Sequence, residues 1–100
     1  MLLYNVTVGV DKEIAHEWLH WMKSEHMLDV LNTGMFKTAK IYQILHETDE
    51  PTISYSVQYF AENLNNVEKY LEEFAPKLRE ESNKKFPNRF AAFRTLLQEV

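Results

Sequence analysis

The chain has no cysteine, and its 100 residues include only two glycines and three prolines. The absence of cysteine excludes disulfides, cysteine-ligated zinc, iron–sulfur clusters and thiol nucleophiles. No apolar run approaches the ~18 residues of a membrane-spanning helix. The first residues also lack the basic and apolar segments of a secretory signal. We therefore expect a cytoplasmic protein with no membrane partner.

Acidic residues slightly outnumber basic residues in this chain. Fifteen Asp and Glu stand against eleven Lys and Arg, a formal net charge of −4. Nucleic-acid binding needs a basic surface that contacts many phosphates, so we expect no nucleic-acid partner. Hydrophobic residues make up 45% of the chain and charged residues 26%, which is typical of a globular protein. This length and composition predict one domain over residues 1–100.

The first half of the chain predicts a strand followed by a helix. Apolar residues alternate over 2–10 and many are β-branched, which is typical of a strand. Asp11 is the predicted cap of a helix whose apolar stripe starts at Ile14. The stripe weakens after Ser24, so we expect the helix to break or change direction near His26. Thr33-Gly34 is the predicted stop, with Gly34 in a left-handed conformation.

Two strands and a second helix come next. Residues 36–47 and 53–61 read as strands, joined by the polar segment 48–52. Asn63 is the predicted cap of a helix that Pro76 should kink or divide. The predicted apolar stripe of this helix consists of Val67, Tyr70, Leu71, Phe74 and Leu78.

A last strand over 89–98 follows the stop at Phe86-Pro87-Asn88, which completes a βαββαβ order. This order predicts an α+β, ferredoxin-like fold, in which a four-stranded antiparallel sheet carries two helices on one face.

Two helices can cover only one face of such a sheet. The central strands should place polar residues on the other face, while both outer strands offer large apolar residues on either side. An uncovered face of that kind would be an unusually large apolar patch. We therefore expect a homodimer in which a second copy packs its sheet there. The predicted dimer-face residues are Asn5, Thr7, Gln58 and Arg94. Asn5 and Gln58 would find partners across the axis or in a ligand, and Arg94 would form an ion pair, face solvent or bind an anion.

Several segments together resemble one family. They include Tyr4-Asn5-Val6-Thr7-Val8, Trp18-Leu19-X-Trp21-Met22 with His26 four residues on, and Arg89-Phe90-X-X-Phe93-Arg94. The chain resembles the DUF4286 family along nearly its whole length. The resemblance implies the dimeric α/β-barrel superfamily, in which two ferredoxin-like sheets pack back to back, but no reaction. Ser82-Asn83 stands where the resemblance would place a second histidine, which argues against a two-histidine site.

His16-Glu17-Trp18-Leu19-His20 matches the H-E-x-x-H pattern of zinc proteases. Both histidines would have to face a shared cavity for that chemistry. At 100° per residue they instead lie on the side of the helix opposite Ile14 and Trp18. We therefore predict no metal site, and we predict no cofactor.

His26 is the best candidate for a catalytic residue. It lies beside the apolar stripe, where the helical pattern fails. A half-buried imidazole there could act as a general acid or base, or it could be a structural histidine bonded to a carbonyl. Tyr4, Trp21, Tyr55 and Tyr59 are the predicted neighbours in a binding pocket, although buried tyrosines are more often core residues.

The residues thus favour a small homodimeric protein that binds an apolar or aromatic small molecule between helices and sheet. The alternative is a non-catalytic module for protein interaction or regulation. Whether the protein is an enzyme stays open at this point.

Overall fold

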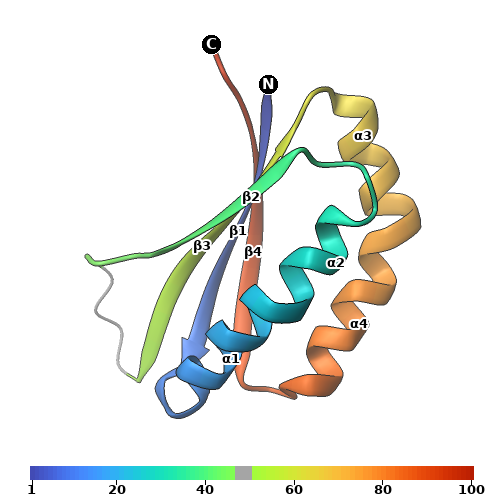
Figure 1. Ribbon diagram of the computed structural model, residues 1–100. Helices are drawn as coiled ribbons and strands as arrows, with labels where there is room; N and C mark the ends of the chain where they lie inside the picture. Colours follow the sequence, from blue (N-terminus) through green and yellow to red (C-terminus); the bar gives the residue numbers. More distant parts are fainter. Residues whose placement is uncertain (47–50) are drawn as a thin grey trace.

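A four-stranded antiparallel sheet forms one layer of the structure, and two helical segments form the other (Figure 1). The computed structural model describes residues 1–46 and 51–100. The strands are β1 (Leu2–Asp11), β2 (Thr38–Gln43), β3 (Thr52–Ala61) and β4 (Phe90–Gln98). Their order across the sheet is β2-β3-β1-β4. The predicted ferredoxin-like βαββαβ fold is confirmed.

Both helical segments pack on the same face of the sheet (Figure 1). The first segment runs through α1 (Ala15–Trp21) and α2 (Met27–Leu31), and the second through α3 (Leu64–Lys69) and α4 (Ala75–Lys85). None of the helices in the described part of the chain has the length and hydrophobicity needed to cross a membrane.

A π turn interrupts each helical segment at its middle. One turn covers Met22–His26 and the other Tyr70–Phe74. The first confirms the predicted break near His26. The second ends just before Pro76, which occupies the first turn of α4. Pro76 has no N–H to donate and its ring would clash with a carbonyl four residues earlier, so a widened turn accommodates it.

The π turns also change which residues are buried. Each inserts an extra residue, so the spacing between successive buried positions becomes five, from Met22 to Met27 and from Tyr70 to Ala75. Leu71, predicted to lie in the apolar stripe, is therefore 39% exposed. The prediction assumed an uninterrupted 100° per residue and was wrong at this position.

The ends of the elements follow local signals, with one exception. The Asn63 side chain caps α3 by accepting a hydrogen bond from the Asn66 N–H at 2.9 Å. Gly34 has a φ of 81°, the left-handed conformation expected after the first helical segment. Asp11 makes no capping hydrogen bond, because its Oδ2 accepts one from Arg89 Nε at 2.7 Å instead.

The predicted strand boundaries agree with the structure except around β2. This strand occupies Thr38–Gln43, which is shorter than the predicted 36–47. Of the predicted turn 48–52, residues 48–50 lie outside the described part of the chain.

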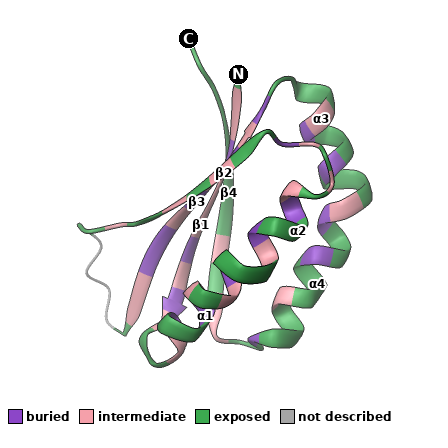
Figure 2. Ribbon diagram, in the orientation of Figure 1, coloured by how far each residue is buried: buried purple, intermediate pink, exposed green. Residues whose placement is uncertain are grey.

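The core lies between the sheet and the helices. Buried positions concentrate in β1, in β3 and on the inner sides of the helices, whereas β2 and β4 are mostly exposed or intermediate (Figure 2). Trp18 is only 2% exposed and packs on Tyr55, with the ring centres 5.1 Å apart. Its predicted place on the sheet-facing stripe is confirmed.

On the outer face of the sheet, polar side chains of the central strands bond to one another. Ser56 Oγ donates to Asn5 Oδ1 at 2.6 Å, and Asn5 Nδ2 donates to Thr7 Oγ1 at 3.0 Å. Gln58 Nε2 donates to Ser56 Oγ at 3.2 Å. These side chains thus have partners within one chain, an outcome that the sequence did not predict.

Replacing Trp18 with Ala should lower the free energy of unfolding by about 3–5 kcal/mol, because a buried ring would leave a cavity in the core. His16→Ala and His20→Ala should each change it by less than about 0.5 kcal/mol, since both side chains are exposed. Urea unfolding of the three variants measures these differences. A Trp18→Ala variant as stable as the two histidine variants would contradict the assigned core.

Candidate functional site

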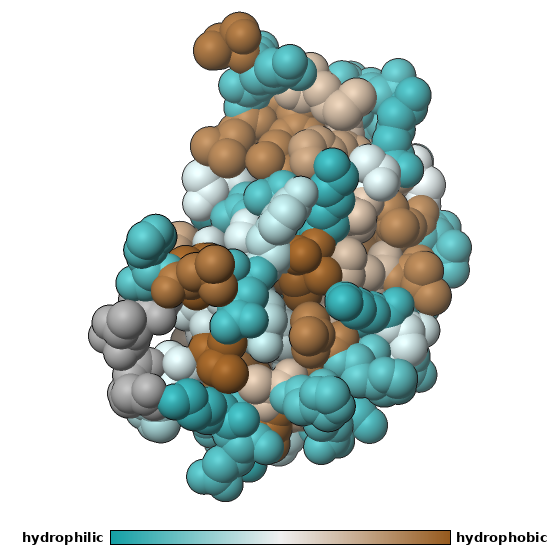
Figure 3. All heavy atoms as spheres, turned by 60° about the vertical axis from the view of Figure 1, so that its left-hand side comes forward, coloured by the Kyte–Doolittle hydropathy of each residue, from teal (hydrophilic) through white to brown (hydrophobic). Residues whose placement is uncertain are grey.

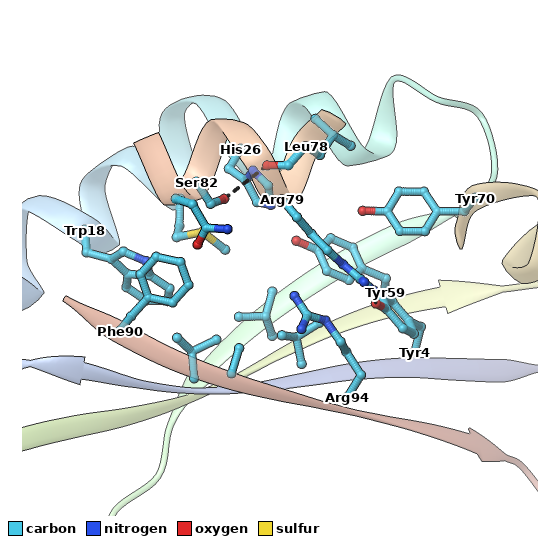
Figure 4. A pocket seen from close by; sticks show the side chains of 16 residues that line it. Tyr4, Trp18, His26, Tyr59, Tyr70, Leu78, Arg79, Ser82, Phe90 and Arg94 are labelled. Atoms are coloured by element: carbon cyan, nitrogen blue, oxygen red, sulfur yellow. Dashed lines mark hydrogen bonds between the residues drawn. The ribbon is translucent and has the colours of Figure 1, made fainter. Parts of the chain in front are cut away.

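A cavity of about 260 Å³ lies between the sheet and the helices (Figure 4). The strands β1, β3 and β4 form its floor, and both helical segments form its walls and roof. The residues that line it are Tyr4, Val6, Val8, Trp18, Met22, His26, Val57, Tyr59, Tyr70, Leu78, Arg79, Ser82, Asn83, Phe90, Ala92 and Arg94.

The two ends of the cavity differ in chemistry (Figure 4). The rings of Trp18 and Phe90 lie at one end, with Ser82 of α4 nearby. Tyr4, Tyr59 and Tyr70 lie at the other, where their hydroxyl groups gather. A flat apolar molecule could therefore lie against the rings at one end while a polar group meets the hydroxyls.

The tyrosines at the polar end pack as a cluster. The Tyr4 ring centre lies 6.3 Å from that of Tyr59 and 5.9 Å from that of Tyr70. Burial raises the pKa of Tyr70 to about 12, and it also raises the pKa of Tyr59 strongly. Both phenols therefore keep their protons near neutral pH and can donate hydrogen bonds into the cavity.

Two arginines reach the same part of the cavity from opposite layers (Figure 4). Arg79 extends from α4, and its Nη2 donates to the Tyr4 hydroxyl at 3.2 Å. Arg94 extends from β4, where it pairs in register with Val6. Arg94 is therefore on the helix-covered face of the sheet, and its predicted place on the dimer face is wrong. Side chains of β4 alternate between the two faces of the sheet, and the register with β1 decides which of them face the helices. The sequence pattern alone did not decide this, because both sides of β4 carry large apolar residues.

His26 lines the cavity from the end of the first π turn. Its ring stacks on Trp21 with the centres 5.0 Å apart, and its buried Nδ1 has no hydrogen-bond partner among the described residues. The pKa of His26 is lowered from 6.5 to about 4, mainly by burial; Asp29 opposes this shift and Arg94 adds to it. Near neutral pH the imidazole is therefore uncharged. A carbonyl partner at Nδ1, the structural alternative, is not present among those residues.

A neutral imidazole with a low pKa limits the chemistry of the site. General acid–base catalysis is most efficient when the pKa lies near the working pH, and that of His26 lies well below it. His26 is therefore suited to hydrogen bonding with a ligand rather than to donating a proton.

Three of the five predicted binding residues line the cavity, namely Tyr4, His26 and Tyr59. Trp21 and Tyr55 do not. Trp21 lies behind His26 with its ring edge-on to Phe86, at 5.6 Å between centres, and Tyr55 lies beneath Trp18. Both therefore support lining residues from outside the cavity.

Sequence reasoning missed most of the lining residues from α4 and β4. Arg79, Ser82 and Asn83 share one side of α4, at a spacing of three and four residues. That spacing was visible in the sequence, and Leu78 was placed correctly on the inward stripe, but the polar residues beside it were not assigned to a cavity.

The H-E-x-x-H segment lies away from the cavity. His16 and His20 are exposed on α1, on the side opposite the buried Trp18. Within the described ranges, no three His, Asp or Glu side chains lie close enough together to hold a metal ion.

The model of the family described as "Domain of unknown function (DUF4286)" matches residues 1–100. The chain belongs to the DUF4286 family. No curated protein matches it.

Solved structures show the fold that this DUF4286 protein shares. HapK from Hahella chejuensis has a TM-score of 0.72 at 8% identity, covering 100% of this chain and 93% of HapK. A dimeric ferredoxin-like protein from an uncultured marine organism has a TM-score of 0.63 at 15% identity, covering 100% and 97%. SnoaB, a cofactor-independent oxygenase from Streptomyces nogalater solved as the N63A mutant, has a TM-score of 0.64 at 9% identity, covering 98% and 92%.

The low pKa of His26 predicts how acid destabilises this DUF4286 protein. Between about pH 6.5 and pH 4 the unfolded chain binds a proton at His26 and the folded chain does not, so stability falls as the pH falls. The loss from this group should be roughly 2–3 kcal/mol between pH 7 and pH 4.5. Urea unfolding at the two pH values measures it.

His26→Gln should remove this contribution, because glutamine does not titrate, so the variant should lose less stability than the wild type on acidification. His20→Gln is the matched control and should behave as the wild type, since His20 is exposed. If His26→Gln lost as much stability as His20→Gln, the imidazole would not be buried and neutral.

Proposed function

We propose that this DUF4286 protein binds a small apolar or aromatic molecule in the cavity between its helices and its sheet, and that it does so as a homodimer. The observation that carries the proposal is the cavity itself. A space of about 260 Å³ lined mainly by rings and aliphatic side chains, with polar groups at one end, has the character of a ligand site.

The size of the cavity limits the ligand. Its volume lies slightly below the roughly 300–1,000 Å³ typical of small-molecule sites. It equals the liquid volume of about nine water molecules. One or two fused rings would fit such a space.

The unpartnered Nδ1 of His26 also supports a ligand site. A buried polar atom without a hydrogen bond costs about 1–3 kcal/mol in a folded protein. A bound ligand could supply the missing hydrogen-bond partner of Nδ1. Without a ligand, a water molecule could do so.

The proposed homodimer rests on the outer face of the sheet. Phe93 is 64% exposed, Leu97 47% and Tyr42 51%, and the register places all three on the face away from the helices. Figure 3 shows this side of the molecule, with hydrophobic side chains interspersed among hydrophilic ones. A second copy would cover these side chains. One structural neighbour of 15% identity is named as a dimeric ferredoxin-like protein.

Calorimetric titration with 2-naphthol and 1-naphthoate tests the ligand site. At least one probe should bind with a Kd below about 1 mM, which corresponds to about −4 kcal/mol. Ala92→Leu should abolish that binding, because Ala92 lines the cavity opposite Val8 in the sheet and the larger side chain would occupy the space.

Ala91→Leu is the matched control, since Ala91 carries the same change on the outer face. It should leave binding intact. If neither probe bound the wild type, or if Ala92→Leu bound as well as Ala91→Leu, the cavity would not be the ligand site.

Light scattering at micromolar concentration tests the dimer. The wild type should have about twice the chain mass of 11.9 kDa. Phe93→Glu should give a monomer by placing a charge in the interface, whereas Leu28→Glu, at an exposed apolar residue on α2, should stay dimeric. A monomeric wild type would favour the alternative of a module that uses this face to bind another protein.

A further inference from the structure

We propose that the ligand is an organic monoanion, an aromatic or apolar body carrying one carboxylate that Arg79 and Arg94 hold. This inference rests on the function proposed above and adds the charge and the chemical class of the ligand.

The charge of the cavity is opposite to that of the chain. The whole chain carries a formal charge of −4. Among the described residues that line the cavity none is acidic, and the two permanently charged ones are Arg79 and Arg94. The cavity is therefore lined by positive charge, although the chain as a whole has more acidic than basic residues.

Among residues 1–46 and 51–100, neither guanidinium group has an anionic partner. Ion pairs there are formed by Lys37, Lys84 and Arg89, but not by Arg79 or Arg94. The positive charges of two side chains that line the same cavity repel each other. A bound anion would remove that repulsion and gain charge-assisted hydrogen bonds.

The polar end of the cavity is rich in donors. A guanidinium group donates hydrogen bonds and accepts none. Because Tyr4 accepts from Arg79, its own proton is free to be donated, and Tyr70 adds a second hydroxyl. An ionised carboxylate only accepts hydrogen bonds, so it is complementary to this set.

The two ends together define the shape of the ligand. Trp18 and Phe90 offer ring faces for the body, and the arginines and tyrosines lie at the far end (Figure 4). The anionic group should therefore be attached to one edge of the ring system. Arg79 and Arg94 are exposed to solvent whereas Tyr4 and Tyr70 are buried, so the anionic group would lie between the solvent and the buried hydroxyl groups.

The test compares two probes of the same shape and different charge, 1-naphthoate and uncharged 1-naphthamide, by calorimetric titration of the wild type. Naphthoate should bind at least about tenfold more tightly at low salt, because charged hydrogen bonds are about twice as strong as neutral ones. Raising the salt concentration should narrow this difference, since ions screen exposed charges.

Arg94→Gln and Arg79→Gln should each reduce the preference for naphthoate while leaving the affinity for naphthamide within about twofold. Arg94→Lys should restore part of the preference, because it keeps the charge. Lys84→Gln is the matched control, since it removes a positive charge from α4 outside the cavity. Thermal melts check that each variant is folded.

The possible outcomes separate this inference from the function it rests on. If naphthoate and naphthamide bound equally well and Ala92→Leu blocked both, the claim that the ligand is an anion would be wrong. The claim that the cavity is a ligand site would stand. Tighter binding of 1-naphthyl phosphate than of naphthoate would contradict the claim that the anionic group of the ligand is a carboxylate. A preference for naphthoate that Lys84→Gln reduced as much as Arg94→Gln would overturn the role of the two arginines.

Discussion

The geometry of the site depends on the extra residue that each helical segment contains. Two straight helices would present one apolar stripe each to the sheet. The π turns Met22–His26 and Tyr70–Phe74 shift the stripe part-way along each segment. Met22, His26 and Tyr70 stand at the ends of these turns, and all three line the cavity. Widened turns of this kind frequently occur at functional sites, where they place side chains that a regular helix would turn away.

The second constraint is the burial of titratable groups, which outweighs the effect of the charges near them. The same low polarity that makes His26 neutral keeps Tyr59 and Tyr70 protonated, because in each case burial disfavours the charged form. The arginines cannot lose their protons in this way, so their charge persists at the cavity. The result is a site with neutral donors, two fixed positive charges and an apolar interior, in a chain whose overall charge is negative.

Much of the fold could be predicted from the sequence, because strands, caps and stops depend on local signals such as the alternation of β1, the Asn63 cap and Gly34. The site could be predicted only in part. Tyr4 and Tyr59 follow from strand alternation, and His26 from the failure of the helical pattern near it. Arg79 was not assigned to the site although Leu78 beside it was placed correctly on the inward stripe, and Arg94 was not assigned because the facing of β4 depends on its register with β1. This register is a tertiary property that a single sequence does not encode locally.

The most direct test of the account is a crystal structure of the protein grown with 1-naphthoate. The account predicts the ring system between Trp18 and Phe90, and the carboxylate within hydrogen-bonding distance of the guanidinium groups of Arg79 and Arg94. It also predicts the π turn at Met22–His26, with the His26 ring facing the ligand. A cavity filled by its own side chains, or naphthoate bound only on the outer face of the sheet, would contradict it.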